Sequence, residues 1–147
     1  MANLSHLSEG EMKEILMLQE RLSLLDTQHK AKDSFMEYIR YIWPGFIEGD
    51  HHRIIAEKLT RVAKGELKRL IVNMPPRHTK SEFASIYFPS WVMGLNPDMK
   101  IMQTTHTADL SINFGRKVRN LMDSDEYSNI FSKVSLASDS KSAGKWQ

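Results

Sequence analysis

No cysteine occurs in this sequence, which excludes a disulfide framework and thiolate metal sites but leaves the redox compartment open. The sequence also lacks an apolar run long enough to span a bilayer, and its polar N-terminus has no signal-peptide core. Neither sign of charge dominates, because 20 Lys and Arg residues stand against 18 Asp and Glu residues. This balance permits a polyanionic partner without requiring one. We therefore expect an intracellular, soluble protein with no membrane partner.

The first part of the sequence carries signals for helices. Ser8 followed by Glu11 has the spacing of a capping box, which predicts a helix start. The run DSFMEYIRYIW is amphipathic and ends at a Pro-Gly pair, so it predicts a second helix. The stretch GDHHRIIAEKLTRVAKGE predicts a third, with Asp50 as N-cap and Gly65 just past its end. We assign residues 1–48 to a helical N-terminal arm.

The pattern changes after Gly65. RLIVN (69–73) and KIMQTT (100–105) are typical of buried parallel strands, and each precedes a helical stretch. We expect Pro89 to interrupt or kink the first of these helices and Thr107 to cap the second. KVSLAS (133–138) is a third strand candidate. This alternation predicts an α/β fold, a three-layer parallel sheet of the P-loop NTPase type, incomplete in residues 49–147.

The turn NMPPRHTKSEF (73–83) connects the first expected strand to its helix. A phosphate-binding loop needs converging backbone N–H groups, a helix N-terminus, a lysine for the terminal phosphates and a hydroxyl for Mg²⁺. Lys80 and Ser81 supply the last two, and the turn has the length of the G-x-x-x-x-G-K-[ST] pattern. Met74 and Thr79 depart from it, because they occupy the two glycine positions.

On the loop pattern alone, a solvated turn formed by Arg77, His78 and Lys80 is a competing interpretation. The strand expected before the loop and the helix expected after it favour nucleotide binding. The double proline can also fix the start of the loop without the flexibility of glycine.

The stretch LIVNMPPRHTKSEFASIYFPSWVMGLNPDMKIMQTTH resembles the ATPase segment of the large terminase subunit of tailed bacteriophages, the motor that packages DNA into procapsids. The loop of that family often reads Pro-Pro-Arg-His-Gly-Lys-Ser. GDHHRIIAEKLTRVAKGELKRLIVN is similar to the stretch before the loop, and FGRKVRNLM, EYSNIF and DSKSAGKWQ match in type and order after it. The resemblance covers roughly residues 40 to 147.

The resemblance implies a catalytic role for two basic residues. Lys80 would hold the β- and γ-phosphates of ATP, and Arg77 would act as an arginine finger in cis. Ser81 would bind Mg²⁺, while backbone N–H groups cradle phosphate oxygens. The alternative for Arg77 is an ion pair with Glu82 or another acidic neighbour. The nucleotide-binding residues that follow from the resemblance are Pro76, Arg77, His78, Thr79, Lys80, Ser81 and Glu82.

Thr79 is the sharpest departure from the family pattern. A β-branched residue is poorly suited to a position that needs a positive φ or a close backbone approach. We therefore expect either a strained loop or one of a different shape, and we expect Thr79→Gly to leave nucleotide binding unchanged or to tighten it.

Other residues are weaker candidates. His51 and His52 point about 100° apart on a helix, which disfavours a shared metal ion. The resemblance implies that the region before the loop could border an adenine pocket, with Trp43 or His52 as stacking candidates. A core tryptophan and a polar residue at a helix start are the preferred interpretation. The basic run GRKVRN (115–120) could touch DNA phosphates but more often forms a solvated face.

These observations lead to one functional hypothesis. The chain would be the ATPase part of a terminase, with ATP and Mg²⁺ as cofactors and double-stranded DNA as the translocated partner. The portal protein and the small terminase subunit would be further partners, in a homo-oligomeric ring in the host cytoplasm. The full-length protein would also be a DNA endonuclease. We expect the chain alone to bind nucleotide weakly and to hydrolyse ATP negligibly, because the acidic strand for the Mg²⁺-bound water is missing from it.

Two alternatives stay open on the sequence. One is another P-loop enzyme, such as a helicase or a small-molecule kinase. The other is a non-catalytic interaction module in which the loop is a relic. A nucleotide-binding titration would separate the second alternative from either enzyme.

Overall fold

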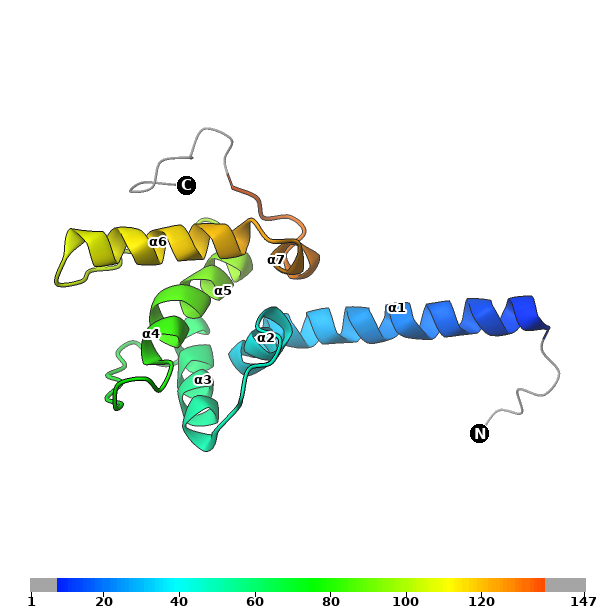
Figure 1. Ribbon diagram of the computed structural model, residues 1–147, viewed down its shortest axis with the longest axis horizontal. Coiled ribbons are helices and arrows are strands. Elements are labelled where there is room, and N and C mark those ends of the chain that lie inside the picture. The colour runs from blue at the N-terminus through cyan, green and yellow to red at the C-terminus, as the bar shows by residue number, and fades with distance from the viewer. Residues whose placement is uncertain (1–7, 137–147) are drawn as a thin grey trace.

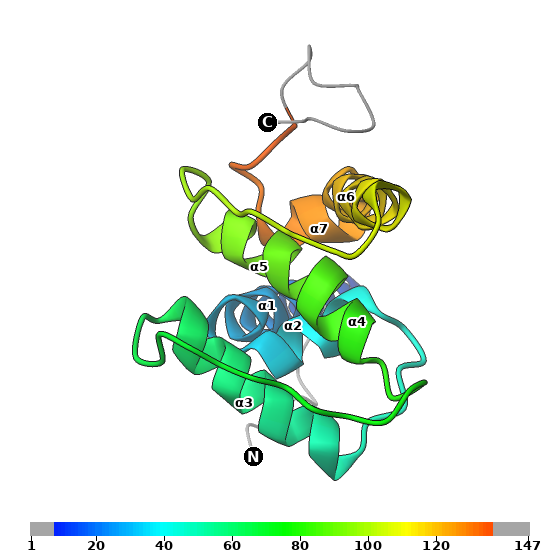
Figure 2. The same ribbon diagram turned by 90° about the vertical axis from the view of Figure 1, so that its left-hand side faces the viewer.

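The computed structural model describes residues 8–136, and the whole of its regular structure in that range is helical (Figure 1). In chain order the helices are α1 (Glu9–Asp33), α2 (Phe35–Ile42), α3 (Asp50–Ala63), α4 (Lys80–Glu82), the π-helical turn η1 (Phe83–Tyr87), α5 (Phe88–Leu95), α6 (Ala108–Met122) and α7 (Asp125–Ile130). Figure 2 shows α4 and α5 crossing the middle of the molecule, with α3 on one side and α6 and α7 on the other.

Helix α1 projects away from the rest of the molecule as a long arm (Figure 1). The predicted capping box is confirmed, since Glu11 N–H donates to Ser8 Oγ and Ser8 N–H donates to the Glu11 carboxylate. Only Ala31, near the end of this helix, is buried. None of the helices in the described residues combines the length and the apolar character needed to cross a membrane.

One apolar core joins α2, α3 and the helical run from Lys80 to Leu95. Phe35, Phe83 and Trp91 meet in its centre, with the ring of Phe35 5.6 Å from that of Phe83 and 5.5 Å from that of Trp91. Trp91 Nε1–H donates a hydrogen bond of 2.8 Å to the carbonyl of Ala31. Because the buried indole N–H finds a partner, the end of α1 is fixed against α5.

Helix α3 begins one residue away from its predicted start and ends where the sequence predicted. Gly49 is the N-cap and Asp50 is the first helical residue, so the predicted N-cap was wrong by one position. Gly65 lies just past the C-terminal end, with a φ of +76°. The N–H groups of Gly65 and Glu66 bond to the carbonyls of Val62 and Arg61, which is a Schellman motif.

Pro89 does not end the helix that it was expected to interrupt. The run continues through α4, η1 and α5, and the turn just before the proline opens to π-helical geometry. Phe88 N–H bonds to the carbonyl of Phe83, five residues back. A π turn is a recognised way for a helix to absorb local disruption without breaking.

The expected parallel sheet is wrong for the described residues, because neither 69–73 nor 100–105 forms a strand. No backbone–backbone hydrogen bond between described residues joins either segment to a neighbour. A strand exists only as part of a hydrogen-bonded ladder, so β-branched residues alone do not create one. Burial alternates from Leu70 to Met74, but these residues pack as a connection that crosses α3 (Figure 2). Residues 8–136 therefore do not form the expected three-layer P-loop fold.

The second unpaired segment borders an open apolar groove. A cavity of about 690 Å³ lies between α5, α6 and residues 97–103, with residues 134–136 at its edge. The Nε2 of Gln103 is buried there without a partner among the described residues. Residues 133–136 of the third strand candidate form no regular element, and its last two residues, like DSKSAGKWQ (139–147), lie outside the described residues.

Candidate phosphate-binding loop

The loop of residues 75–79 leads directly into the helical run, which begins at Lys80 as predicted. Phe83 N–H bonds to the carbonyl of Thr79, which makes Thr79 the N-cap of the run. The first N–H groups of a helix have no acceptor within it. The helix start therefore offers free donors and the positive end of its dipole at Lys80 and Ser81.

Two non-glycine residues of the loop adopt left-handed backbone conformations. Arg77 has a φ of +64° and Thr79 a φ of +57°. Left-handed residues among right-handed ones turn successive N–H groups towards one concave face, as in anion-binding nests. Thr79 thus takes a conformation that glycine adopts readily, and it does so despite its branched Cβ.

His52 lies beneath this loop and contacts it through a hydrogen bond. Its Nε2 lies 2.7 Å from Thr79 Oγ1, and Gly49 N–H donates to its Nδ1 over 2.9 Å. Thr79 Oγ1–H in turn donates to the carbonyl of His78 over 2.7 Å. The side chain of His52 is buried, with 6% of its surface exposed. The loop is therefore tied to the N-terminus of α3.

The basic side chains of the loop face solvent. Arg77, His78 and Lys80 are exposed, and neither Arg77 nor Lys80 forms an ion pair within residues 8–136. The alternative pairing of Arg77 with Glu82 is not formed. Two cations without a carboxylate partner beside a helix N-terminus favour the binding of an anion.

Three histidines gather where α3 meets the loop. The rings of His51 and His52 are 3.8 Å apart, and the ring of His78 lies 5.6 Å from that of His51. His78 Nδ1 is also 2.8 Å from the carbonyl of Pro76. Burial lowers the pKa of His52, and the nearby His51 and His78 lower it further, while Glu48 opposes them. His52 is therefore held in its neutral form.

No set of three or more His, Asp or Glu side chains within residues 8–136 is placed to hold a metal ion. The Ser81 hydroxyl is exposed in the first turn of the helix. Glu82, the next residue, is half-buried and lines a separate cavity. A single protein oxygen is a small contribution to a Mg²⁺ site, and Mg²⁺ in proteins commonly takes its other ligands from phosphates and water.

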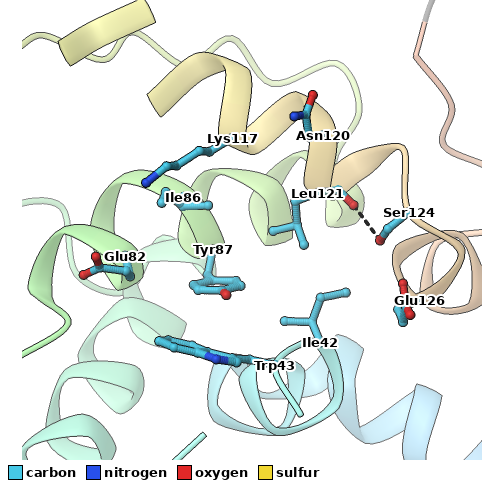
Figure 3. Close-up of a pocket in the computed structure, with 10 residues that line it drawn as sticks. All are labelled: Ile42, Trp43, Glu82, Ile86, Tyr87, Lys117, Asn120, Leu121, Ser124 and Glu126. Atoms are coloured by element: carbon cyan, nitrogen blue, oxygen red, sulfur yellow. Dashed lines mark hydrogen bonds between the residues drawn. The ribbon is translucent and has the colours of Figure 1, made fainter. Parts of the chain in front are cut away.

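An open cavity of about 530 Å³, separate from the apolar groove, lies between α2, η1, α6 and α7 (Figure 3). Trp43 forms part of its wall and stacks on Tyr87, with the ring centroids 5.2 Å apart. In Figure 3 Glu82 lies to the left of the two rings, and Lys117 lies above them on α6. Trp43 already has an aromatic partner, and His52 is packed between Phe46 and Phe83. Both rings thus have aromatic neighbours, and Trp43 also borders the open cavity.

Sequence reasoning missed the link between His52 and Thr79. The signal that could have found part of it is the spacing from Gly49 to His52, because with Gly49 as N-cap His52 is the third helical residue, where side chains often accept the N-cap N–H. The contact with Thr79 spans 27 residues and could not be read from local spacing. Of the basic run on α6, Arg116 and Lys117 are exposed and Arg119 is half-buried.

Comparisons of the chain with models of known protein families, with curated proteins and with solved structures gave no significant match.

Proposed function

We propose that residues 76–82 bind the phosphates of a nucleotide, with ATP as the ligand. The observation that carries this proposal is the junction at Lys80, where a loop with two left-handed residues leads into a helix start. The two exposed cations Arg77, in the loop, and Lys80, at the first helical position, lie at this junction without an ion pair among the described residues. Converging N–H groups, a helix dipole and unpaired positive side chains each favour bound phosphate.

Each residue of the loop makes a different contact with the phosphates or with Mg²⁺. Lys80 lies at the first helical position, from which its ammonium group can contact the terminal phosphates. The exposed guanidinium of Arg77 can form paired hydrogen bonds to phosphate oxygens. Ser81 offers one oxygen to Mg²⁺, with phosphates and water completing its shell. When bound, Mg²⁺ supplies positive charge that neutralises the phosphates.

The wider role that we propose is the ATPase of a DNA-packaging motor of the terminase type, acting in the host cytoplasm. The support for it is the sequence resemblance from GDHHRIIAEKL through the loop to FGRKVRN. Double-stranded DNA, the portal protein and the small terminase subunit are partners on that basis alone. Phosphate binding by the loop is the part of this role to test first.

The test is calorimetric titration of the 147-residue chain with Mg-ATP and, separately, with tripolyphosphate. We expect Lys80→Ala to weaken both about ten- to a hundredfold, since a hydrogen bond to a charged group contributes about 1.5–3 kcal/mol. Lys68→Ala is the matched control, because Lys68 is also exposed and also lacks an ion pair within the described residues. Equal affinities for Lys80→Ala and the unaltered chain would refute the proposal.

A further inference from the structure

We infer that His52 is a positioning residue that holds the loop in its phosphate-binding conformation by fixing Thr79. The inference rests on the proposed function for its consequence, but the contacts that carry it belong to the loop itself. His52 and Thr79 come from different elements and meet in a single hydrogen bond of 2.7 Å.

Both ends of the hydrogen-bonded chain require the same tautomer of His52. Gly49 N–H donates to Nδ1, so Nδ1 must carry a lone pair. The hydroxyl proton of Thr79 goes to the carbonyl of His78, so Oγ1 must accept from the histidine. His52 is therefore neutral with its proton on Nε2. The series of hydrogen bonds then runs from the Gly49 N–H through His52 and Thr79 to the His78 carbonyl, and each group in it has a partner.

Thr79 needs such an anchor because of its backbone. Its φ of +57° is a conformation that β-branched residues rarely adopt, and a side chain locked from two sides can hold it. Its hydroxyl accepts from His52 and donates to the adjoining carbonyl, which fixes its rotamer and the orientation of the neighbouring peptide. The two hydrogen bonds replace the conformational freedom that glycine would supply.

The anchor itself is rigid. The ring of His52 packs 4.8 Å from that of Phe46 and 5.3 Å from that of Phe83. Phe83 is fully buried, and its N–H bonds to the carbonyl of Thr79. The side chain of Thr79 is therefore hydrogen-bonded to α3, and its carbonyl is hydrogen-bonded to the helix that it caps. The core beneath the loop determines the loop's shape through these two bonds.

The titratable groups that face His52 come from α3, from the residues before it and from the loop. His51 precedes it on α3, Glu48 lies before the helix, and His78 comes from the loop, while η1 contributes the apolar Phe83. The carboxylate of Glu48 is engaged by Arg40 and Arg53. The neutral donor form of His52 is thus the one that its surroundings favour.

A pair of substitutions at Thr79 tests the inference without disturbing the core. Thr79→Val keeps the shape of the side chain but removes the hydroxyl, whereas Thr79→Ser keeps the hydroxyl and removes the branch. We expect Thr79→Val to weaken Mg-ATP binding about tenfold and Thr79→Ser, which keeps the hydroxyl, to weaken it much less. Equal affinity of the valine and serine variants would overturn the inference.

The second arm is a double-mutant cycle. His52→Phe keeps a ring against Phe46 and Phe83 but cannot donate to Thr79, so we expect about tenfold weaker Mg-ATP binding. In a Thr79→Gly background the same substitution should have little effect, because glycine adopts a positive φ without support. A purely structural role of His52 would cost the same affinity in both backgrounds, and that result would also overturn the inference.

A third measurement does not depend on binding. Nitrogen NMR of the His52 ring should show the proton on Nε2, and the carbon shifts of Thr79 should report a left-handed backbone that is lost in His52→Phe. If the unaltered chain binds no Mg-ATP while these spectra appear as expected, the proposed function fails and the positioning role stands. If Mg-ATP binds but His52→Phe leaves the Thr79 shifts unchanged, the positioning role fails and the proposed function stands.

Discussion

The loop of residues 75–79 and the segment that leads into it, residues 67–74, are neighbours in sequence but are held in different ways. The loop is anchored by the hydrogen bonds of Thr79 to His52 and to Phe83. The segment has no backbone hydrogen bond to the described residues beyond the one at Leu67. Hydrogen bonds to residues of the core hold the backbone of the loop in its conformation. The segment instead crosses α3 without backbone hydrogen bonds to it beyond the one at Leu67.

The same contrast separates the two sides of the helical run from Lys80 to Leu95. The side towards α2 is densely packed around Phe83 and Trp91. The side towards residues 97–103 borders the open groove of about 690 Å³. The loop therefore lies at the end of a helix that is well supported on one side.

The largest difference should appear in amide hydrogen exchange. We expect the amides of α5 to exchange only through global unfolding, and those of residues 68–74 to exchange close to the rates of an unfolded chain. The reason is that the first set donates within a buried helix and the second has no acceptor in the described structure. Mass spectrometry of peptides from the two regions measures this directly. Comparable protection of both regions would contradict the comparison and indicate a hydrogen-bonding partner for the segment.

A pair of truncations should show the same contrast in stability. Phe83 is 1% exposed and Ile71 is 87% exposed. Phe83→Ala should lower the free energy of unfolding by about 3–5 kcal/mol, as expected for a buried aromatic residue. Ile71→Ala should change it by less than about 0.5 kcal/mol, because a side chain in water loses little.

Urea denaturation followed by circular dichroism measures both values. A cost for Ile71→Ala that approaches that of Phe83→Ala would mean that Ile71 is buried in solution against something that covers residues 67–74. That result would end the distinction between the loop and the segment.

Features set by short spans of sequence could be predicted here, and features that need distant partners could not. The capping box at Ser8, the glycine after α3, the cap at Thr107 and the helix start at Lys80 all follow from residues within one turn of each other. The strands at 69–73 and 100–105 were wrong because their apolar runs fit a sheet only if other strands pair with them. His52 was seen as a polar residue at a helix start, and its contact with Thr79 became visible only in three dimensions.

The smallest expected effect is a pH dependence of stability that arises at His52. Its pKa in the folded protein is lowered from 6.5, first by burial and then by His51. The unfolded chain therefore binds a proton at a higher pH than the folded protein does. The contribution of neutral His52 to stability is complete above pH 6.5 and is lost as the pH falls towards the lowered pKa. In structural terms, a proton on Nδ1 would face the Gly49 N–H and break the hydrogen bond between them.

Urea denaturation at pH 7.5 and pH 5.0 tests this effect in a window where a neighbouring carboxylate does not interfere. Hydrogen bonds from Arg40 and Arg53 lower the pKa of Glu48 from 4.5 to about 2, so its contribution is lost only below pH 4.5. We expect the stability of the unaltered chain to fall between the two pH values, and that of His52→Phe to fall less. The control is His106→Gln, which removes an exposed histidine before α6 and should keep the full loss. An equal loss in His52→Phe and the unaltered chain would mean that His52 is not held neutral beneath the loop, and the loop would then lose its proposed anchor.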